Sequence, residues 1–169
     1  TDQALSEAVA HFRAGEAESR RTGGKLWSVF ATACDVSEER YLKLIVARLA
    51  TYLQIPGYGE ALVNVNGWDM DTLNSFRSAP IVAGMTGAID SVASYTELAE
   101  IEKLIPQEWR PAAVGDAKTC AQRWLDQFNA GADGIIIHAS TPEEFAPVLA
   151  EYERIRPSAL FAQRTNRPG

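Results

Sequence analysis

The spacing of apolar and polar positions predicts a chain of many helices and only two confident strands. At the start, Leu5, Ala8, Val9 and Phe12 recur at helical spacing and indicate an amphipathic helix over residues 2–21. The glycine-containing segment that follows is expected to end this helix.

Two later segments lack polar alternation and are expected to be buried strands. Residues 26–33, LWSVFATA, are largely apolar and rich in residues that favour strands. The run from Ile135 to Ile137 is β-branched throughout, which is typical of a strand covered on both faces in a parallel sheet. We therefore expect Ile136 to be buried within the sheet layer.

Helix signals surround the second of these strands. Asp116 is expected to cap the helix before it, and Gly131 suits the left-handed position after that helix ends. Thr141, Pro142 and Glu144 fit the N-cap, N1 and N3 positions of the next helix. A strand that leads into a capped helix is half of a βα repeat, and parallel α/β proteins place their chemistry at the C-terminal ends of such strands.

The long stretch between the two strands is predicted to be helical. A helix is expected from Glu38, capped by Asp35 or Ser37, and residues at about 55–110 are expected to be an insertion of short helices and loops. Two buried parallel strands cannot make a stable sheet alone, because each strand needs neighbours for its backbone groups. The pattern therefore predicts part of a larger α/β fold.

Four stretches of the sequence are distinctive. They read LWSVFATACDVSEE, RYLKLIVARLATYLQIPGYGEALVNVNGWD, LIPQEWRPAAVGDAKTCAQRW and FNAGADGIIIHASTPEEF. These stretches resemble the C-terminal part of the luciferase-like flavin or deazaflavin (F420) oxidoreductases, and within them the actinobacterial F420-dependent group. The resemblance extends from about residue 25 to Arg156.

The resemblance implies an α/β fold, namely the C-terminal part of a (β/α)8 TIM barrel of the bacterial luciferase-like type. It implies that residues 26–33 are the seventh strand, that residues 134–139 are the eighth, and that residues 1–169 form a single-domain segment. The first six strands are then absent from this chain, and most family determinants of cofactor binding are absent with them. Catalytic residues are therefore not assigned.

For the complete enzyme, the resemblance implies F420-dependent hydride transfer to or from a small organic substrate. One alternative is an FMN-dependent monooxygenase of the same fold. Another, of a different class, is a non-catalytic fragment with a structural or dimerisation role. The expected partners are a small-molecule substrate and, as alternatives, a second copy of the chain or the missing N-terminal part of the barrel.

Candidate cofactor-binding residues lie where the two predicted strands end. Thr32 can donate a hydrogen bond to a phosphate, and Ser140 follows the second strand. His138 can bond a cofactor phosphate or a substrate carbonyl, or move a proton. The structural alternatives are strand-end packing for Thr32 and a bond to neighbouring backbone for His138. Cys34 is interpreted as a small buried hydrophobe, because no basic neighbour is evident that would favour a thiolate.

Candidate substrate contacts lie in the predicted insertion, where Tyr58 and Trp68 can form walls of a pocket. The alternative for both is packing on the outside of the barrel, or a dimer contact. Trp109 and Trp124 are interpreted as core aromatics.

Composition and charge limit the partners. The chain has 169 residues, 46% of them hydrophobic and 22% charged, which is ordinary for a soluble globular protein. Its formal charge is −6 and no basic patch is evident, which argues against binding to nucleic acid or to an anionic membrane. The two cysteines match no metal-ligand spacing, so no metal is expected. No apolar run is long enough to cross a membrane and no signal peptide is visible, so a cytoplasmic location is expected.

Overall fold

The computed structural model describes residues 1–158, and it divides the chain into two compact units. We call Val36–Ala112 the helical unit; the sheet unit is formed by Asp2–Asp35 and by residues 113–158. In the sequence, the helical unit thus interrupts the sheet unit. It includes the predicted insertion at about residues 55–110 and the predicted helix from Glu38. Each unit has a hydrophobic core of its own.

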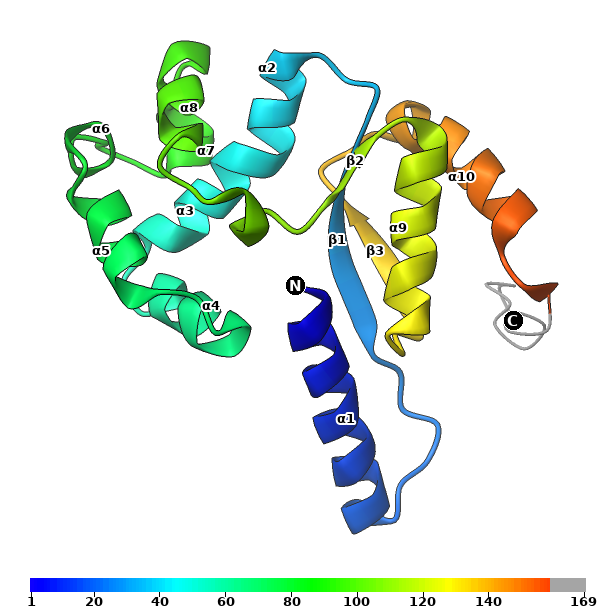
Figure 1. The fold of residues 1–169 in the computed structure, drawn as a ribbon. Helices are drawn as coiled ribbons and strands as arrows, with labels where there is room; N and C mark the ends of the chain where they lie inside the picture. Colours follow the sequence, from blue (N-terminus) through cyan, green and yellow to red (C-terminus); the bar gives the residue numbers. More distant parts are fainter. Residues whose placement is uncertain (159–169) are drawn as a thin grey trace. The chain divides into compact units, whose positions relative to one another are not determined.

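Up to residue 158, the sheet unit contains three strands and three helices (Figure 1). In chain order these are α1 (Asp2–Ser19), β1 (Trp27–Cys34), β2 (Ala113–Gly115), α9 (Ala117–Asn129), β3 (Gly134–His138) and α10 (Pro142–Ile155).

The three strands form one parallel sheet in the order β2-β1-β3. Ala31 of β1 pairs with His138 of β3, so the C-terminal ends of the two predicted strands lie at the same edge, as expected. On the other side of β1, Thr32 pairs with Ala113. The three-residue strand β2 was not predicted from the sequence, because it is too short to show a period.

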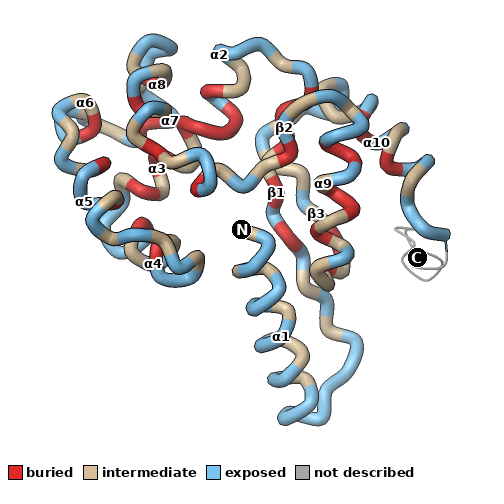
Figure 2. Tube along the Cα trace, in the orientation of Figure 1, coloured by how far each residue is buried: buried red, intermediate tan, exposed pale blue. Residues whose placement is uncertain are grey.

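One face of the sheet is covered by helices. Phe30 of β1 is buried in a core that it shares with Trp124 and Leu125 of α9 and with Val148 and Tyr152 of α10. The helix start signals are confirmed in this unit. Figure 2 shows the buried positions along β1 and α9, whereas α1 has none.

The opposite face of the sheet is open, and this corrects the expectation for Ile136. The exposed fractions are 49% for Trp27, 62% for Val29, 49% for Ile136 and 42% for Val114. Side chains alternate between the two faces of a strand, and within the sheet unit the described helices α9 and α10 cover only the face of Phe30. The prediction that β3 is covered on both faces is therefore wrong for this chain.

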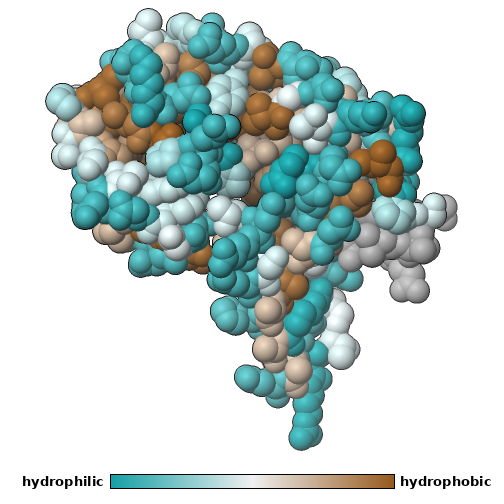
Figure 3. Space-filling view, in the orientation of Figure 1, coloured by the Kyte–Doolittle hydropathy of each residue, from teal (hydrophilic) through white to brown (hydrophobic). Residues whose placement is uncertain are grey.

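Helix α1 is held to the rest of the sheet unit mainly by polar contacts. Arg13 Nη2 lies 2.6 Å from Asp133 Oδ2, and Arg123 Nη2 lies 3.0 Å from Asp2 Oδ1. Gly131, at φ +103°, lets α1 approach closely, because a Cβ there would lie 2.8 Å from Val9 Cγ1. On the face drawn in Figure 3, α1 mixes hydrophilic with weakly hydrophobic residues.

The helical unit consists of helices only. They are α2 (Glu38–Tyr41), the π-helical η1 (Leu42–Ala47), α3 (Arg48–Gln54), α4 (Tyr58–Asn66), α5 (Met70–Ser78), α6 (Pro80–Ala83), α7 (Ile89–Val92), α8 (Tyr95–Glu102) and the 3-10 turn η2 (Gln107–Trp109). The predicted helix from Glu38 is confirmed, with Ser37 as its cap, and its middle turn is π-helical.

The core of the helical unit is built around that helix. Leu42, Val46 and Leu53 are buried together with Phe76 and Ile101. Arg77 fixes residues 55–57, which follow α3. Its Nη2 donates a hydrogen bond of 2.8 Å to the Ile55 carbonyl oxygen, and its guanidinium also forms an ion pair with Glu60.

Candidate functional site

The strand exits of the sheet unit are marked by an unusual backbone. Asp35 follows β1 at φ +48°, and Ala139 follows β3 at φ +68°. Residues other than glycine rarely adopt this left-handed conformation, which costs of order 1–3 kcal/mol and is common at functional sites. Two such residues at the same edge of one sheet make this edge the first candidate for a site.

Thr32 lies at this edge but faces the helices. It is fully buried, and its Oγ1 accepts a hydrogen bond of 3.0 Å from Trp124 Nε1. Its carbonyl oxygen accepts a hydrogen bond from Ser140 Oγ. The structure thus brings Thr32 and Ser140 together, and both hydroxyl groups are engaged inside the chain. These hydrogen bonds connect β1 to α9 and to the loop after β3.

His138 lies on the other face of the sheet. Strand alternation and its pairing with Ala31 place it on the open face, in line with Ile136 and Gly134. It is half-buried, and the small side chain of Ala31 lies beside it in the pairing. Among the three predicted cofactor residues, His138 is the one that strand alternation places on the open face.

The open face itself is apolar along its length. Trp27 packs over Gly134, where a Cβ would lie 2.5 Å from the indole, so glycine is required at that position. Val29 pairs with Ile136 in the middle of the face. Sheets of parallel strands are normally covered on both sides, so this face is suited to contact further protein.

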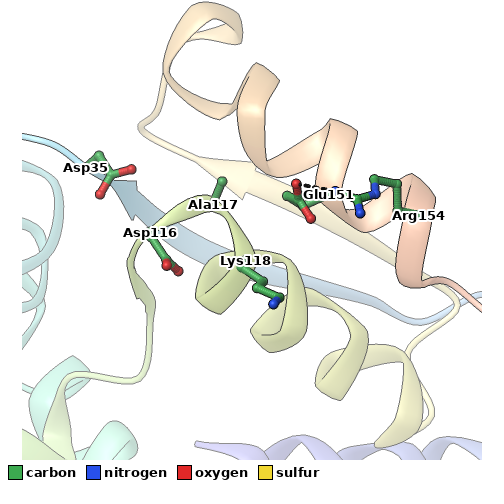
Figure 4. Close-up of a pocket in the computed structure, with 6 residues that line it drawn as sticks. All are labelled: Asp35, Asp116, Ala117, Lys118, Glu151 and Arg154. Atoms are coloured by element: carbon green, nitrogen blue, oxygen red, sulfur yellow. Dashed lines mark hydrogen bonds and ion pairs between the residues drawn. The ribbon is translucent and has the colours of Figure 1, made fainter.

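A hollow of about 360 Å³ lies on the helix-covered side of the sheet unit. Figure 4 shows its lining: Asp35 at the end of β1, Asp116, Ala117 and Lys118 at the start of α9, and Glu151 and Arg154 on α10. Its charges are mixed, and Arg154 pairs with Glu151 at 2.9 Å. A hydrogen bond from Thr119 lowers the pKa of Asp116, which caps α9. This lining does not favour an anion, because three carboxylates face it.

The two cysteines meet near this hollow. Both are buried, which confirms the interpretation of Cys34 as a small buried residue. Cys34 and Cys120 belong to one buried cluster, and Cys120 Sγ lies 3.7 Å from the carbonyl oxygen of Gly115, the residue of β2 that pairs with Cys34. Burial raises the pKa of Cys120 to about 12. Sequence spacing could not reveal this pair, because the whole helical unit separates the two residues.

The two predicted substrate contacts lie at opposite ends of α4 in the helical unit. Trp68 stacks on Trp109, with ring centroids 4.6 Å apart and an angle of 7° between the planes. It is partly buried and packs against the core of the helical unit. Tyr58 is half-exposed and lies beside Tyr52, with ring centroids 5.0 Å apart. The structure does not bring Tyr58 and Trp68 together.

Metal binding and membrane insertion have no support in the part of the chain that the structure describes. Within residues 1–158, no group of three or more His, Cys, Asp or Glu side chains could hold a metal ion. No helix in the same range has the length and apolar character needed to cross a membrane.

Comparison with known protein families, with curated proteins and with solved structures gives no match.

Proposed function

We propose that this chain forms the last βα units of a luciferase-like (β/α)8 barrel whose activity is F420-dependent hydride transfer to or from a small organic substrate. The observation that carries the proposal is the open apolar face of a parallel sheet whose other face is covered by α9 and α10. In such barrels, helices cover the outer face of the strands, and bulky apolar side chains of the inner face fill the interior in layers. Val29 and Ile136 fit one such layer.

The position of His138 supports a site at the C-terminal end of this barrel. It is the last residue of β3 on the face assigned to the interior, beside the small residue Ala31. There the imidazole would donate to or accept from a cofactor or substrate oxygen, or hold a proton. The cofactor, when bound, would supply the hydride chemistry.

Thr32 and Ser140 have a positioning role in this proposal. Their hydrogen bonds fix the end of β1 and the loop after β3, next to His138. The residues present fit one polar contact to a cofactor or substrate rather than a complete site, because barrel sites are assembled from the loops after several strands. An FMN-dependent monooxygenase of the same fold would use the same contact.

A second candidate is a structural role in association with further protein. It is favoured by the engaged hydroxyl groups of Thr32 and Ser140 and by the stacking of Trp68 on Trp109. In this case the open sheet face would serve only as a packing surface.

The test is cofactor titration of the protein expressed from its complete reading frame. We expect F420 to bind with one molecule per chain, and His138→Ala to lower the rate of hydride transfer by roughly 10²–10⁴-fold if the imidazole transfers a proton. The control is His11→Ala, which changes the exposed histidine of α1. FMN binding in place of F420 would favour the monooxygenase. If the protein binds neither F420 nor FMN, and His138→Ala and His11→Ala behave alike, the structural role is the remaining candidate.

A further inference from the structure

We propose that Cys34 and Cys120 are a redox-active pair that a hydroperoxide converts into an intramolecular disulfide. The inference does not depend on the proposed function. It rests on the position of the pair, on its surroundings and on the path of the chain between the two residues.

The two thiols come together through β2. Cys34 is the last residue of β1 and pairs with Gly115, the last residue of β2. Cys120 lies in the first turns of α9, and its Sγ is 3.7 Å from the carbonyl oxygen of the same Gly115. Both cysteines belong to one hydrophobic core, and both are neighbours of Gly115.

The two thiols differ in their exposure to solvent. The exposed fraction is 8% for Cys34 and 0% for Cys120. The carboxylate of Asp35, next to Cys34, lines the hollow between α9 and α10, and its Oδ2 is 3.9 Å from Cys34 Sγ. Cys34 is therefore the thiol that meets the oxidant, and Cys120 is the resolving thiol.

The chemistry balances with a hydroperoxide as the oxidant. The Cys34 thiolate attacks the peroxide oxygen, the O–O bond breaks, and a sulfenic acid forms while water or an alcohol leaves after protonation. Cys120 then attacks the Cys34 sulfur, the S–S bond forms, and the sulfenic oxygen leaves as water. In total two thiols lose two electrons and two protons, and the peroxide is reduced.

The environment makes the reaction slow at neutral pH. Burial raises the pKa of both thiols, and the charges of Asp35 and Asp116, which face the pair, raise it further. Since the thiolate is the reacting species, the rate of disulfide formation rises with pH. The pair is thus suited to respond to sustained oxidation rather than to brief exposure.

The consequence of the bond follows from the path of the chain. The chain leaves the sheet unit after Asp35 and returns to it at Ala113. A bond between Cys34 and Cys120 would close a covalent loop that contains the whole helical unit. Such a bond removes conformations from the unfolded chain, more so for long loops.

The test is peroxide treatment of the full chain in its reduced form, followed by alkylation in denaturant, tryptic digestion and mass spectrometry without reduction. We expect peptide 26–40 linked to peptide 119–123, with a mass two hydrogen atoms below the sum of the two. The link should form faster at alkaline than at neutral pH. The oxidised chain should show a Tm higher by roughly 5–15 °C, and a dithiol should reverse the shift.

Two single variants keep the test decisive. Cys120→Ser should abolish the link and let a sulfenic acid accumulate on Cys34, where a dimedone-type probe detects it. Cys34→Ser should abolish the link with little sulfenic acid on Cys120. Separate oxidation of both thiols without a link, a link only between chains, or two thiols that stay alkylatable under conditions that oxidise the denatured chain would each overturn the proposal.

Discussion

The indole Nε1 of Trp124 donates a 3.0 Å hydrogen bond to Thr32 Oγ1 in the buried layer between α9 and β1. An indole N–H is a donor only, and when it is buried it needs an acceptor. This single contact turns a predicted cofactor ligand, Thr32, into a structural acceptor for a predicted core aromatic. The hydrogen bond between these two residues therefore connects the end of β1 to α9.

The first prediction concerns this contact. Thr32→Val keeps the shape of the side chain but leaves the Trp124 N–H without its acceptor, so we expect a loss of about 1–3 kcal/mol in the free energy of unfolding. Chemical denaturation monitored by tryptophan fluorescence measures it. Thr22→Val, at an exposed loop position, is the control and should change stability by less than about 0.5 kcal/mol. Equal effects of the two variants would show that the hydrogen bond is unimportant.

A second prediction separates the two faces of the sheet. In the 169-residue chain, Ile136→Ala should cost about 1 kcal/mol or less, because Ile136 is half-exposed. Phe30→Ala, on the helix-covered face of the neighbouring strand, should cost about 3–5 kcal/mol. In a protein that contains the complete barrel, the cost of Ile136→Ala should rise to about 2–5 kcal/mol. A small cost in both proteins would argue against the barrel.

A third prediction concerns acid stability of the helical unit. The hydrogen bond from Arg77 lowers the pKa of Glu60 from 4.5 to about 2. Because the folded pKa is lower than the unfolded one, the contribution of this pair is fully present above pH 4.5 and is lost as the pH falls toward about 2. Glu60→Gln should therefore reduce the pH dependence of unfolding in this window.

Urea unfolding at a series of pH values, followed through the helical circular dichroism signal, provides the measurement. Glu108→Gln is the matched control, since it removes an exposed carboxylate from the same unit. If both variants show the same acid limb as the original chain, the Arg77–Glu60 pair does not act in this way.

A fourth prediction is that the 169-residue chain alone binds neither F420 nor FMN tightly. It supplies His138 as the one open polar contact of the predicted cofactor set, and tight binding requires many preorganised contacts acting together. Calorimetric titration is the measurement. Low-micromolar or tighter binding with one cofactor per chain would mean that the site is complete without further strands, and the phosphate site would then be sought near His138.

A fifth prediction concerns the attachment of α1. Gly131→Ala places a Cβ against Val9 in a left-handed backbone conformation, and should cost about 1–3 kcal/mol. Gly15→Ala is the matched control: it lies inside α1 with no atom within 4 Å of the added Cβ, and should be neutral or stabilising by about 0.5–1 kcal/mol. Thermal unfolding of both variants checks this. Adding Val9→Ala to Gly131→Ala should recover part of the loss.

Local signals in the sequence were sufficient for most helix boundaries. Thr141 accepts from the Glu144 N–H, and Asp116 accepts from the Thr119 N–H, as the capping patterns predict. These contacts join residues three positions apart, so the sequence contains both partners of each. The parallel direction of the two predicted strands was also confirmed, because buried apolar strands of this kind are typical of parallel sheets.

The open face and the thiol pair could not be predicted in this way. The apolar run around Ile136 shows that a strand favours burial on both sides, but not whether a second layer is present in the chain. The contact between Cys34 and Cys120 depends on the return of the chain at β2. Both features are set by distant residues, which periodicity does not report. The place of His138 at the end of β3 was predicted, because the end of a strand can be located from the sequence pattern.

The insertion of the helical unit between β1 and β2 also has a consequence for the order of folding. The β1 edge that accepts β2 can close only after the whole segment from Val36 to Ala112 has been brought back to it. The entropic cost of closing a loop grows with the length of flexible chain within it. A helical unit that has already formed, with its own core, replaces much of that flexible length by a compact body. We therefore expect the helices of 36–112 to form first and the sheet to assemble in the slow, rate-limiting step.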